Sequence, residues 1–138
     1  MKFHPLKLPR YMPTAIVASA ILYLTLAPDP VPGTNFMLFQ GTDKVVHAIM
    51  MLGLMLTASF DYARTSDQAV SRVPLINYAI IGGMTILFGA AIEVAQEISG
   101  LGRSAEIADL IADAIGAFIG LLLAPSVTTN VIRFLRRY

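Results

Sequence analysis

Four apolar stretches without any Lys, Arg, Asp or Glu follow one another along the chain, at residues 11–28, 45–60, 73–92 and 114–132. A helix that crosses a lipid bilayer needs roughly 20 mostly apolar residues, with about 17 as the lower limit. Each stretch reaches that length when the residues at its edges are included. The pattern predicts four transmembrane helices, over residues 11–28, 43–60, 73–98 and 106–124, the last of which ends before Pro125.

The first stretch has a second interpretation, as a cleaved signal peptide. A basic segment precedes it, and Ala18-Ser19-Ala20 resembles a cleavage site. That tripeptide lies inside the apolar run and not after it, which favours a retained helix.

Composition supports a membrane protein. The chain is 56% hydrophobic and 14% charged, with a mean hydropathy of +0.68, whereas an ordinary soluble domain is about 25% charged. The absence of cysteine excludes disulfides, thiolate nucleophiles and Cys-ligated zinc. We therefore expect an all-α integral membrane protein that forms a single domain over residues 1–138, has the lipid bilayer as its partner and has no nucleic-acid signature.

The cations are distributed unevenly. Eight of the ten lie in the N-terminal arm, the second connection and the C-terminal segment. Short cytoplasmic loops are enriched in Lys and Arg, so both termini are predicted to be cytoplasmic and the other two connections to face outward. The end of the chain, Val131–Tyr138, resembles a short interfacial tail.

Ionisable and polar residues gather at the predicted outer ends of the second, third and fourth helices. Such groups are costly at membrane depth, so a cluster of them is a candidate functional site. Its members are Asp43, Lys44, His47, Glu93, Gln96, Glu97, Arg103, Glu106, Asp109 and Asp113.

Asp43 and His47 are four residues apart and therefore share one helix face. In one interpretation Asp43 caps the helix and accepts a hydrogen bond from His47, while Lys44 extends to the lipid phosphates. In the other, His47 carries a proton or ligates a metal.

Glu93, Gln96 and Glu97 form a polar patch near the end of the third helix. Glu93 is the deepest of them, so its carboxyl should be paired, hydrogen-bonded or protonated, and Arg103 is the obvious cation. Arg103 either fixes the third helix against the fourth through an ion pair or binds an anionic headgroup or phosphate.

Asp109 and Asp113 line one face of the early fourth helix. Asp113 has no cation within its own helix, so His47, Arg103 or a bound metal must compensate its charge, or it is protonated.

Gly116 and Gly120 continue that face in a small-xxx-small pattern. This pattern lets helices approach closely, so we expect these glycines to pack against a neighbouring helix and the two acids to face inward.

The order of these residues resembles the VanZ-like family of bacterial membrane proteins, whose founding member is associated with teicoplanin resistance. The resemblance rests on D-K-x-x-H at Asp43–His47, E-x-x-Q at Glu93–Gln96, R-x5-D at Arg103–Asp109 and G-x3-G at Gly116–Gly120. The chain departs from the family pattern at Met51, Gly102 and Asp113, where an aromatic residue, a proline and an asparagine are common. The departure at Asp113 weakens the case for a role of that residue.

The resemblance implies a multi-pass protein of the bacterial cytoplasmic membrane. Teicoplanin is a glycopeptide that acts at the outer membrane surface on a lipid-linked cell-wall precursor. The resemblance therefore implies ligands of that kind, but it supplies no biochemical reaction.

Three functions agree with these features. In the first, an envelope protein binds a lipid-linked cell-wall or glycopeptide-related ligand, with Lys44 and Arg103 contacting phosphate or carboxylate groups. In the second, an intramembrane hydrolase or transferase uses the cluster for acid–base chemistry or for a divalent metal such as Zn, Mn or Fe. Its candidate metal ligands are His47, Glu93, Asp109 and Asp113.

The third function is proton-linked transport. The pattern predicts no ionisable group in the inner halves of the helices, so a transport path needs a relay or the interface of a homo-oligomer. The predicted outer side has a net charge of −5 and the inner side +6. A net-acidic site of this kind favours binding of a proton, a metal or a cationic ligand group over binding of a phosphate by basic side chains alone.

Overall fold

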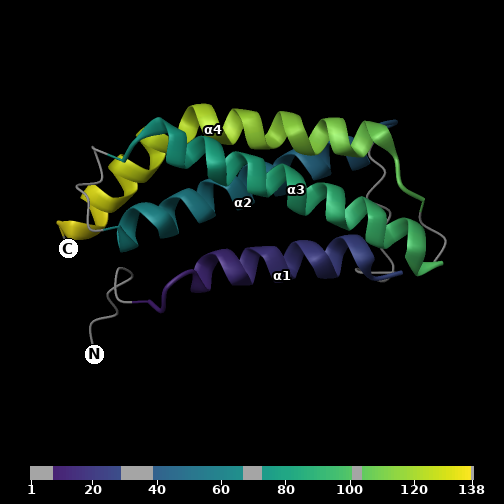
Figure 1. Cartoon of the computed structure of the whole chain (residues 1–138), viewed down its shortest axis with the longest axis horizontal. Coiled ribbons are helices and arrows are strands. Elements are labelled where there is room, and N and C mark those ends of the chain that lie inside the picture. The colour runs from purple at the N-terminus through teal and green to yellow at the C-terminus, as the bar shows by residue number, and fades with distance from the viewer. Residues whose placement is uncertain (1–7, 29–38, 67–72, 101–103, 138) are drawn as a thin grey trace.

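The computed structural model describes residues 8–28, 39–66, 73–100 and 104–137. It places four helices in them: α1 (Met12–Leu26), α2 (Thr42–Thr65), α3 (Leu75–Ser99) and α4 (Ile107–Arg136). All regular secondary structure of these described ranges is helical. The helices run alternately up and down, so the start of α1 and the end of α4 lie at one end of the bundle (Figure 1). The predicted all-helical bundle is confirmed.

Three of the four helices, α2, α3 and α4, are long and apolar enough to cross a membrane, and α1 is shorter. The 15 residues of α1 extend about 22 Å at 1.5 Å per residue, against roughly 30 Å for the hydrocarbon core. Pro13 lies in its first turn, where a missing N–H costs nothing. Ala27 takes an extended conformation before Pro28, which ends the helix.

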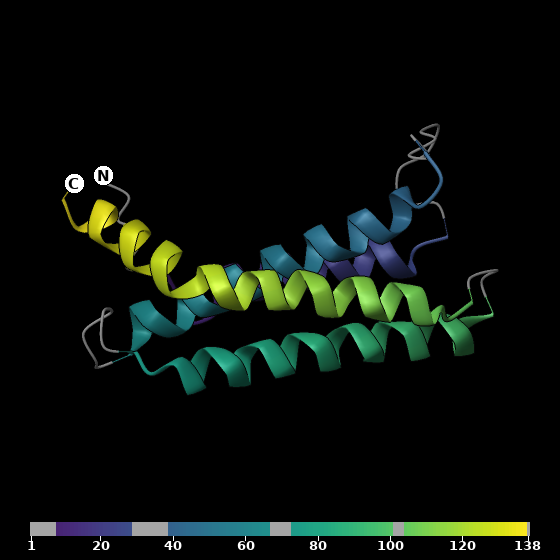
Figure 2. The same ribbon diagram turned by 90° about the horizontal axis from the view of Figure 1, so that it is seen from above.

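Two helices are longer than predicted. α2 continues beyond residue 60 to Thr65, and α4 continues through Pro125 to Arg136. The prediction that α4 ends before Pro125 is wrong, because the proline bends the helix and does not terminate it (Figure 2). The last turns are anchored by Ile132, which is only 1% exposed and packs against Ala63 of α2. The C-terminal segment is therefore part of the bundle, and not merely an interfacial tail.

Just beyond the proline, α4 is hydrogen-bonded to α3. The Thr128 hydroxyl donates to the Ala124 carbonyl at 2.6 Å, and Tyr78 Oη lies 3.1 Å from Thr128 Oγ1. A hydroxyl has one proton, so Tyr78 is the donor in the second bond. This buried pair holds α4 against α3 next to the bend.

α2 and α4 approach most closely, at the two predicted packing glycines. A Cβ at Gly116 would overlap the Ala48 carbonyl oxygen, and one at Gly120 would lie 2.6 Å from Met55 Cγ. Only glycine permits backbones to approach this closely. The contact fixes the depth of α4 relative to α2. It therefore positions Asp113, about one turn before Gly116, and Asp109, about two turns before it.

The start of α1 is held by α2. Asp61 Oδ2 accepts the Thr14 backbone N–H at 2.9 Å and the Thr14 hydroxyl at 2.5 Å. Arg64 Nε donates to Asp61 Oδ1 at 2.6 Å, and the same guanidinium donates to the Leu8 and Pro9 carbonyls. Because α1 has no capping side chain of its own, Asp61 supplies the cap from a neighbouring helix.

Candidate functional site

Three helix ends come together at the end of the bundle opposite the start of α1 and the end of α4 (Figure 1). These are the first turns of α2 and α4 and the last two turns of α3. Gly41, with φ of 92°, begins α2, and Gly100, with φ of 64°, ends α3. Both are left-handed conformations that favour glycine. The side chains that meet here are Asp43, Lys44, His47, Glu93, Glu106, Asp109 and Asp113.

Lys44 organises the outer layer of this cluster. Its Nζ lies 2.6 Å from Asp43 Oδ2, 2.5 Å from Glu106 Oε2 and 2.8 Å from Asp109 Oδ1. The Asp43 and Glu106 side chains are about half exposed, and that of Asp109 is nearly buried. Three carboxylates already surround the ammonium group, so Lys44 is not free to contact an anion.

His47 organises the inner layer. Its Nδ1 lies 3.0 Å from Asp113 Oδ1 and 3.9 Å from Glu93 Oε1, and its Nε2 lies 4.0 Å from Asp109 Oδ2. The hydrogen bond joins Nδ1 to Asp113 Oδ1, and its donor is set by the tautomer of the imidazole. All four residues are buried, and Asp113 is fully so. The three acids thus enclose the imidazole on both of its nitrogen-bearing edges.

Three buried carboxylate oxygens, Glu93 Oε1, Asp109 Oδ1 and Asp113 Oδ2, have no hydrogen-bond donor of good geometry among the described residues. Asp109 Oδ1 still has the Lys44 ammonium at 2.8 Å, so Glu93 Oε1 and Asp113 Oδ2 are the two without a nearby cation from lysine. Glu93 uses its other oxygen, Oε2, to accept the Glu106 backbone N–H at 3.0 Å, which caps the start of α4. A buried carboxylate oxygen that lacks a partner is costly unless a proton or cation neutralises it. The inner layer is therefore suited to a small cation.

Among the described residues, two groups of three have the spacing for a metal ion. One ligand atom each from His47, Glu93 and Asp113 lie within 4.8 Å of one another, and the same holds for Asp43, Glu106 and Asp109. The second group surrounds Lys44, whose ammonium already forms an ion pair with each of its three carboxylates. Of the four residues proposed from the sequence as metal ligands, the geometry groups His47, Glu93 and Asp113, whereas Asp109 bridges the two layers.

The expected bond from His47 to Asp43 is not formed. Asp43 pairs with Lys44, and the partner of His47 is Asp113, which lies 66 residues later in the chain. One of the candidate compensations for Asp113, a pairing with His47, is therefore present.

Gln96 does not join the cluster. Its Nε2 donates to the Thr25 carbonyl at 3.0 Å, so it ties α3 to the last turn of α1. Glu97 accepts the Ala105 backbone N–H at 2.9 Å. Arg103, with its expected pairing to Glu93, lies outside the described residues.

Two residues that contribute to the ionisable networks were not selected from the sequence. A Cβ at Gly89 would overlap the Asp113 carboxylate, so this glycine makes room for the acid. Asp61 is fully buried at the opposite end of the bundle, and the expectation that the inner halves lack ionisable groups is wrong. The i,i+3 spacing of Asp61 and Arg64 was a usable signal, but it fell outside the predicted helix.

A family model described as VanZ/LLP1 matches residues 4–129, which is nearly the whole chain. The match agrees with the resemblance of the ordered polar motifs. No curated protein and no solved structure matches the chain.

Proposed function

Because the chain belongs to the VanZ/LLP1 family of membrane proteins, we propose that it binds a lipid-linked cell-wall or glycopeptide-related ligand at the outer surface of the bacterial cytoplasmic membrane. The cation distribution supports this orientation, since it favours cytoplasmic termini. The start of α1 and the end of α4 share one end of the bundle, and the polar cluster lies at the other (Figure 1). In this orientation the cluster meets the outer leaflet.

The observation that carries the proposal is the excess of carboxylates in the cluster. Among the described residues, Lys44 is the one cation within ion-pair distance of Asp43 and Glu106, and it shares Asp109 with His47. His47 also faces Glu93 and Asp113. Charge-assisted hydrogen bonds from an amine to such carboxylates are strong. The cluster therefore selects a cationic group, such as a peptide amine, on an otherwise lipid-like ligand.

The half-exposed outer layer is the surface that such a ligand meets first. Asp43 and Glu106 extend from two different helices and converge on Lys44. An incoming amine shares these carboxylates with Lys44 or displaces it. Arg103, close in sequence to Glu106, is the proposed contact for a phosphate of the same ligand.

The test is binding of the purified full chain to a lipid-linked cell-wall precursor that carries a free peptide amine. We expect N-acetylation of that amine, or the double change Asp43→Asn with Glu106→Gln, to weaken binding about tenfold. Glu97→Gln is the matched control, because Glu97 lies at the same end but outside the Lys44 group. Equal affinity for the free and acetylated precursors would overturn the proposal. Unchanged binding by Arg103→Ala would remove the phosphate contact from it.

A second candidate is a hydrolase or transferase that acts on a lipid headgroup. The specific observation is the set formed by His47, Glu93 and Asp113, with its two unpartnered oxygens. These residues would hold a divalent ion of the Zn, Mn or Fe type, which polarises a phosphoryl oxygen or activates water. Without a metal, the His47–Asp113 pair would act as a general base.

Metal analysis of the purified protein separates the metal-dependent form of this candidate from simple binding. The metal-dependent form predicts one divalent ion per chain in the wild type and its loss in His47→Ala, with Glu97→Gln as the control. A wild-type protein purified without chelators that contains no stoichiometric ion would eliminate the metal-dependent form.

A further inference from the structure

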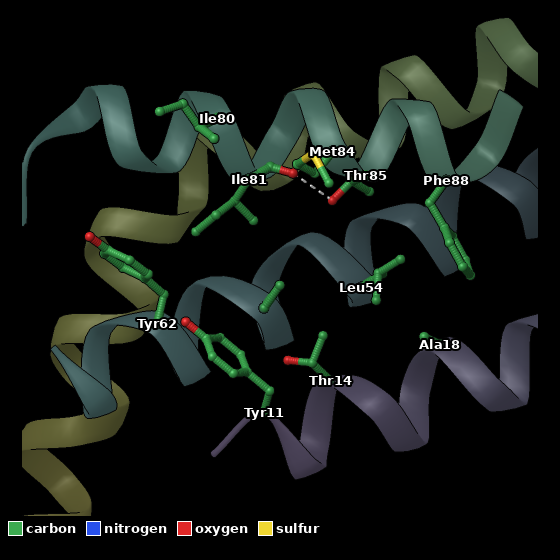
Figure 3. Close-up of a pocket in the computed structure, with 11 residues that line it drawn as sticks. Tyr11, Thr14, Ala18, Leu54, Tyr62, Ile80, Ile81, Met84, Thr85 and Phe88 are labelled. Atoms are coloured by element: carbon green, nitrogen blue, oxygen red, sulfur yellow. Dashed lines mark hydrogen bonds between the residues drawn. The ribbon is translucent and has the colours of Figure 1, made fainter. Parts of the chain in front are cut away.

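An apolar groove runs between α1 and α3, with α2 as its floor (Figure 3). It encloses about 300 Å³. α1 contributes Thr14 and Ala18, and the floor includes Leu54. The two threonine hydroxyls along the groove are engaged within the protein: that of Thr85 donates to the Ile81 carbonyl, and that of Thr14 donates to Asp61. The groove thus offers an apolar lining to whatever occupies it.

The groove lies within the part of the bundle that spans the membrane. Ile80 and Met84 line it and are 58% and 63% exposed, and both belong to the span Leu75–Ser99. From Ile80 to Phe88 it extends about 12 Å along α3, at 1.5 Å per residue. One leaflet of the hydrocarbon core is roughly 15 Å deep. The groove therefore has the length and the lining of a site for one lipid chain.

A polar cavity of about 250 Å³ continues the groove at the start of α1 and the end of α2. Its lining includes Arg10 and Thr65, and it shares Tyr11 and Tyr62 with the groove. Figure 3 shows both tyrosine rings at one end of the groove, opposite Phe88. The two cavities thus form one site with an apolar part and a polar part.

Arg10 gives the polar part a positive charge. One of its nitrogens, Nη2, donates to the Thr65 carbonyl at 3.0 Å. Among the residues that the structure describes, no carboxylate pairs with Arg10. A guanidinium has five N–H donors, so Arg10 has others with which to bind a phosphate.

The walls of the polar part are held in place before any ligand arrives. Asn77 of α3 donates to the Tyr62 hydroxyl at 2.9 Å. Tyr11 has a φ of 58°, a left-handed conformation that is uncommon for a tyrosine. Arg64 supports it by binding the Pro9 carbonyl two residues earlier. A rigid frame of this kind reduces the entropy lost when a ligand binds.

We propose that this composite site binds one phospholipid with an anionic headgroup, whose acyl chain fills the groove and whose phosphate contacts Arg10. The occupant needs an apolar chain of about leaflet length and an anion at its end, and a bilayer phospholipid supplies both. If the groove were instead occupied by an apolar helix or by the groove of a second copy of the chain, the charge of Arg10 would have no counterion. The site is at the opposite end of the bundle from the His47 cluster and does not depend on the function proposed for that cluster.

The test is native mass spectrometry of the full chain in detergent, titrated separately with phosphatidylglycerol and with phosphatidylcholine of the same chain length. We expect one tightly bound phosphatidylglycerol. Arg10→Gln should weaken its binding about tenfold and abolish the preference over phosphatidylcholine. Arg10→Lys should retain the preference, because it retains the charge. Arg133→Gln is the matched control, since Arg133 is an exposed cation in the last turns of α4, outside this site.

A second pair of variants tests the groove. Ala18→Phe fills it and should displace both lipids, whereas Ala20→Phe makes the same change at an exposed position of α1 outside the groove. Thermal unfolding of each variant shows whether it is folded. Equal affinity of the wild type for the two lipids, or identical lipid binding by Ala18→Phe and Ala20→Phe, would overturn the proposal.

Discussion

Replacing Gly116 by alanine tests whether the α2–α4 contact positions the polar cluster. The added Cβ would overlap the Ala48 carbonyl oxygen and would lie 2.8 Å from its carbonyl carbon. Carbon atoms pack best at about 3.5–4.0 Å, so α4 must withdraw by roughly 1 Å. The obstruction is backbone and cannot rotate away, which places the cost near the upper end of the usual overpacking range, about 3 kcal/mol. Alanine regains about 1 kcal/mol of helix propensity, so the net loss is about 2 kcal/mol.

The same withdrawal would lengthen the His47–Asp113 contact, which is 3.0 Å and lies about one turn away. A separation of 3.6 Å or more is no longer a hydrogen bond, so the inner layer should open as well. The assay is thermal unfolding in detergent micelles, followed by circular dichroism. Gly83→Ala is the matched control, because a Cβ there meets nothing within 4 Å. If Gly116→Ala and Gly83→Ala unfold at the same temperature, the glycine contact does not hold the two helices in place.

Three further changes and one topology measurement probe other parts of the molecule. Asp61→Ala should destabilise the bundle by about 3 kcal/mol, because Arg64 loses its carboxylate partner and α1 loses its cap. Thermal unfolding measures this loss, and a loss of stability smaller than that caused by Gln96→Leu would contradict the prediction. Gln96→Leu removes only the bond to Thr25 and should cost about 1 kcal/mol in the same assay. Gly89→Ala should displace the carboxylate of Asp113 and, if a metal is present, lower the metal affinity of the protein about tenfold. Metal analysis of the purified variant measures this, and a metal content equal to that of the wild type would contradict the ligand set of His47, Glu93 and Asp113. A fluorescent protein fused to the C-terminus should fold and fluoresce in the cytoplasm, whereas activity of a C-terminal alkaline phosphatase fusion would reverse the proposed orientation.

The local pattern of the chain was sufficient for the helices and for the end of the bundle at which the polar residues gather. Apolar length, interrupted by short turn segments, predicted four transmembrane helices. The described residues form four helices, of which three are long and apolar enough to cross a membrane. This succeeds because a helix satisfies its own backbone and only its length must match the lipid. The i,i+4 spacings of Asp43 with His47 and of Asp109 with Asp113 likewise follow from helix geometry alone. Both spacings can be predicted without knowing which helix packs against the one that carries them.

Only the tertiary structure decided which side chains are partners. His47 pairs with Asp113 and not with Asp43, which is nearer in the sequence. Gln96 donates a hydrogen bond to α1 and does not join the polar cluster. These choices depend on the rotation and depth of each helix against its neighbour, which contacts such as that of Gly116 determine. The continuation of α4 beyond Pro125 has the same origin, because a proline interrupts few of a helix's bonds and packing can hold the remaining turns together. Periodicity along one chain specifies which face of a helix is polar, but the partner of that face is set by long-range packing.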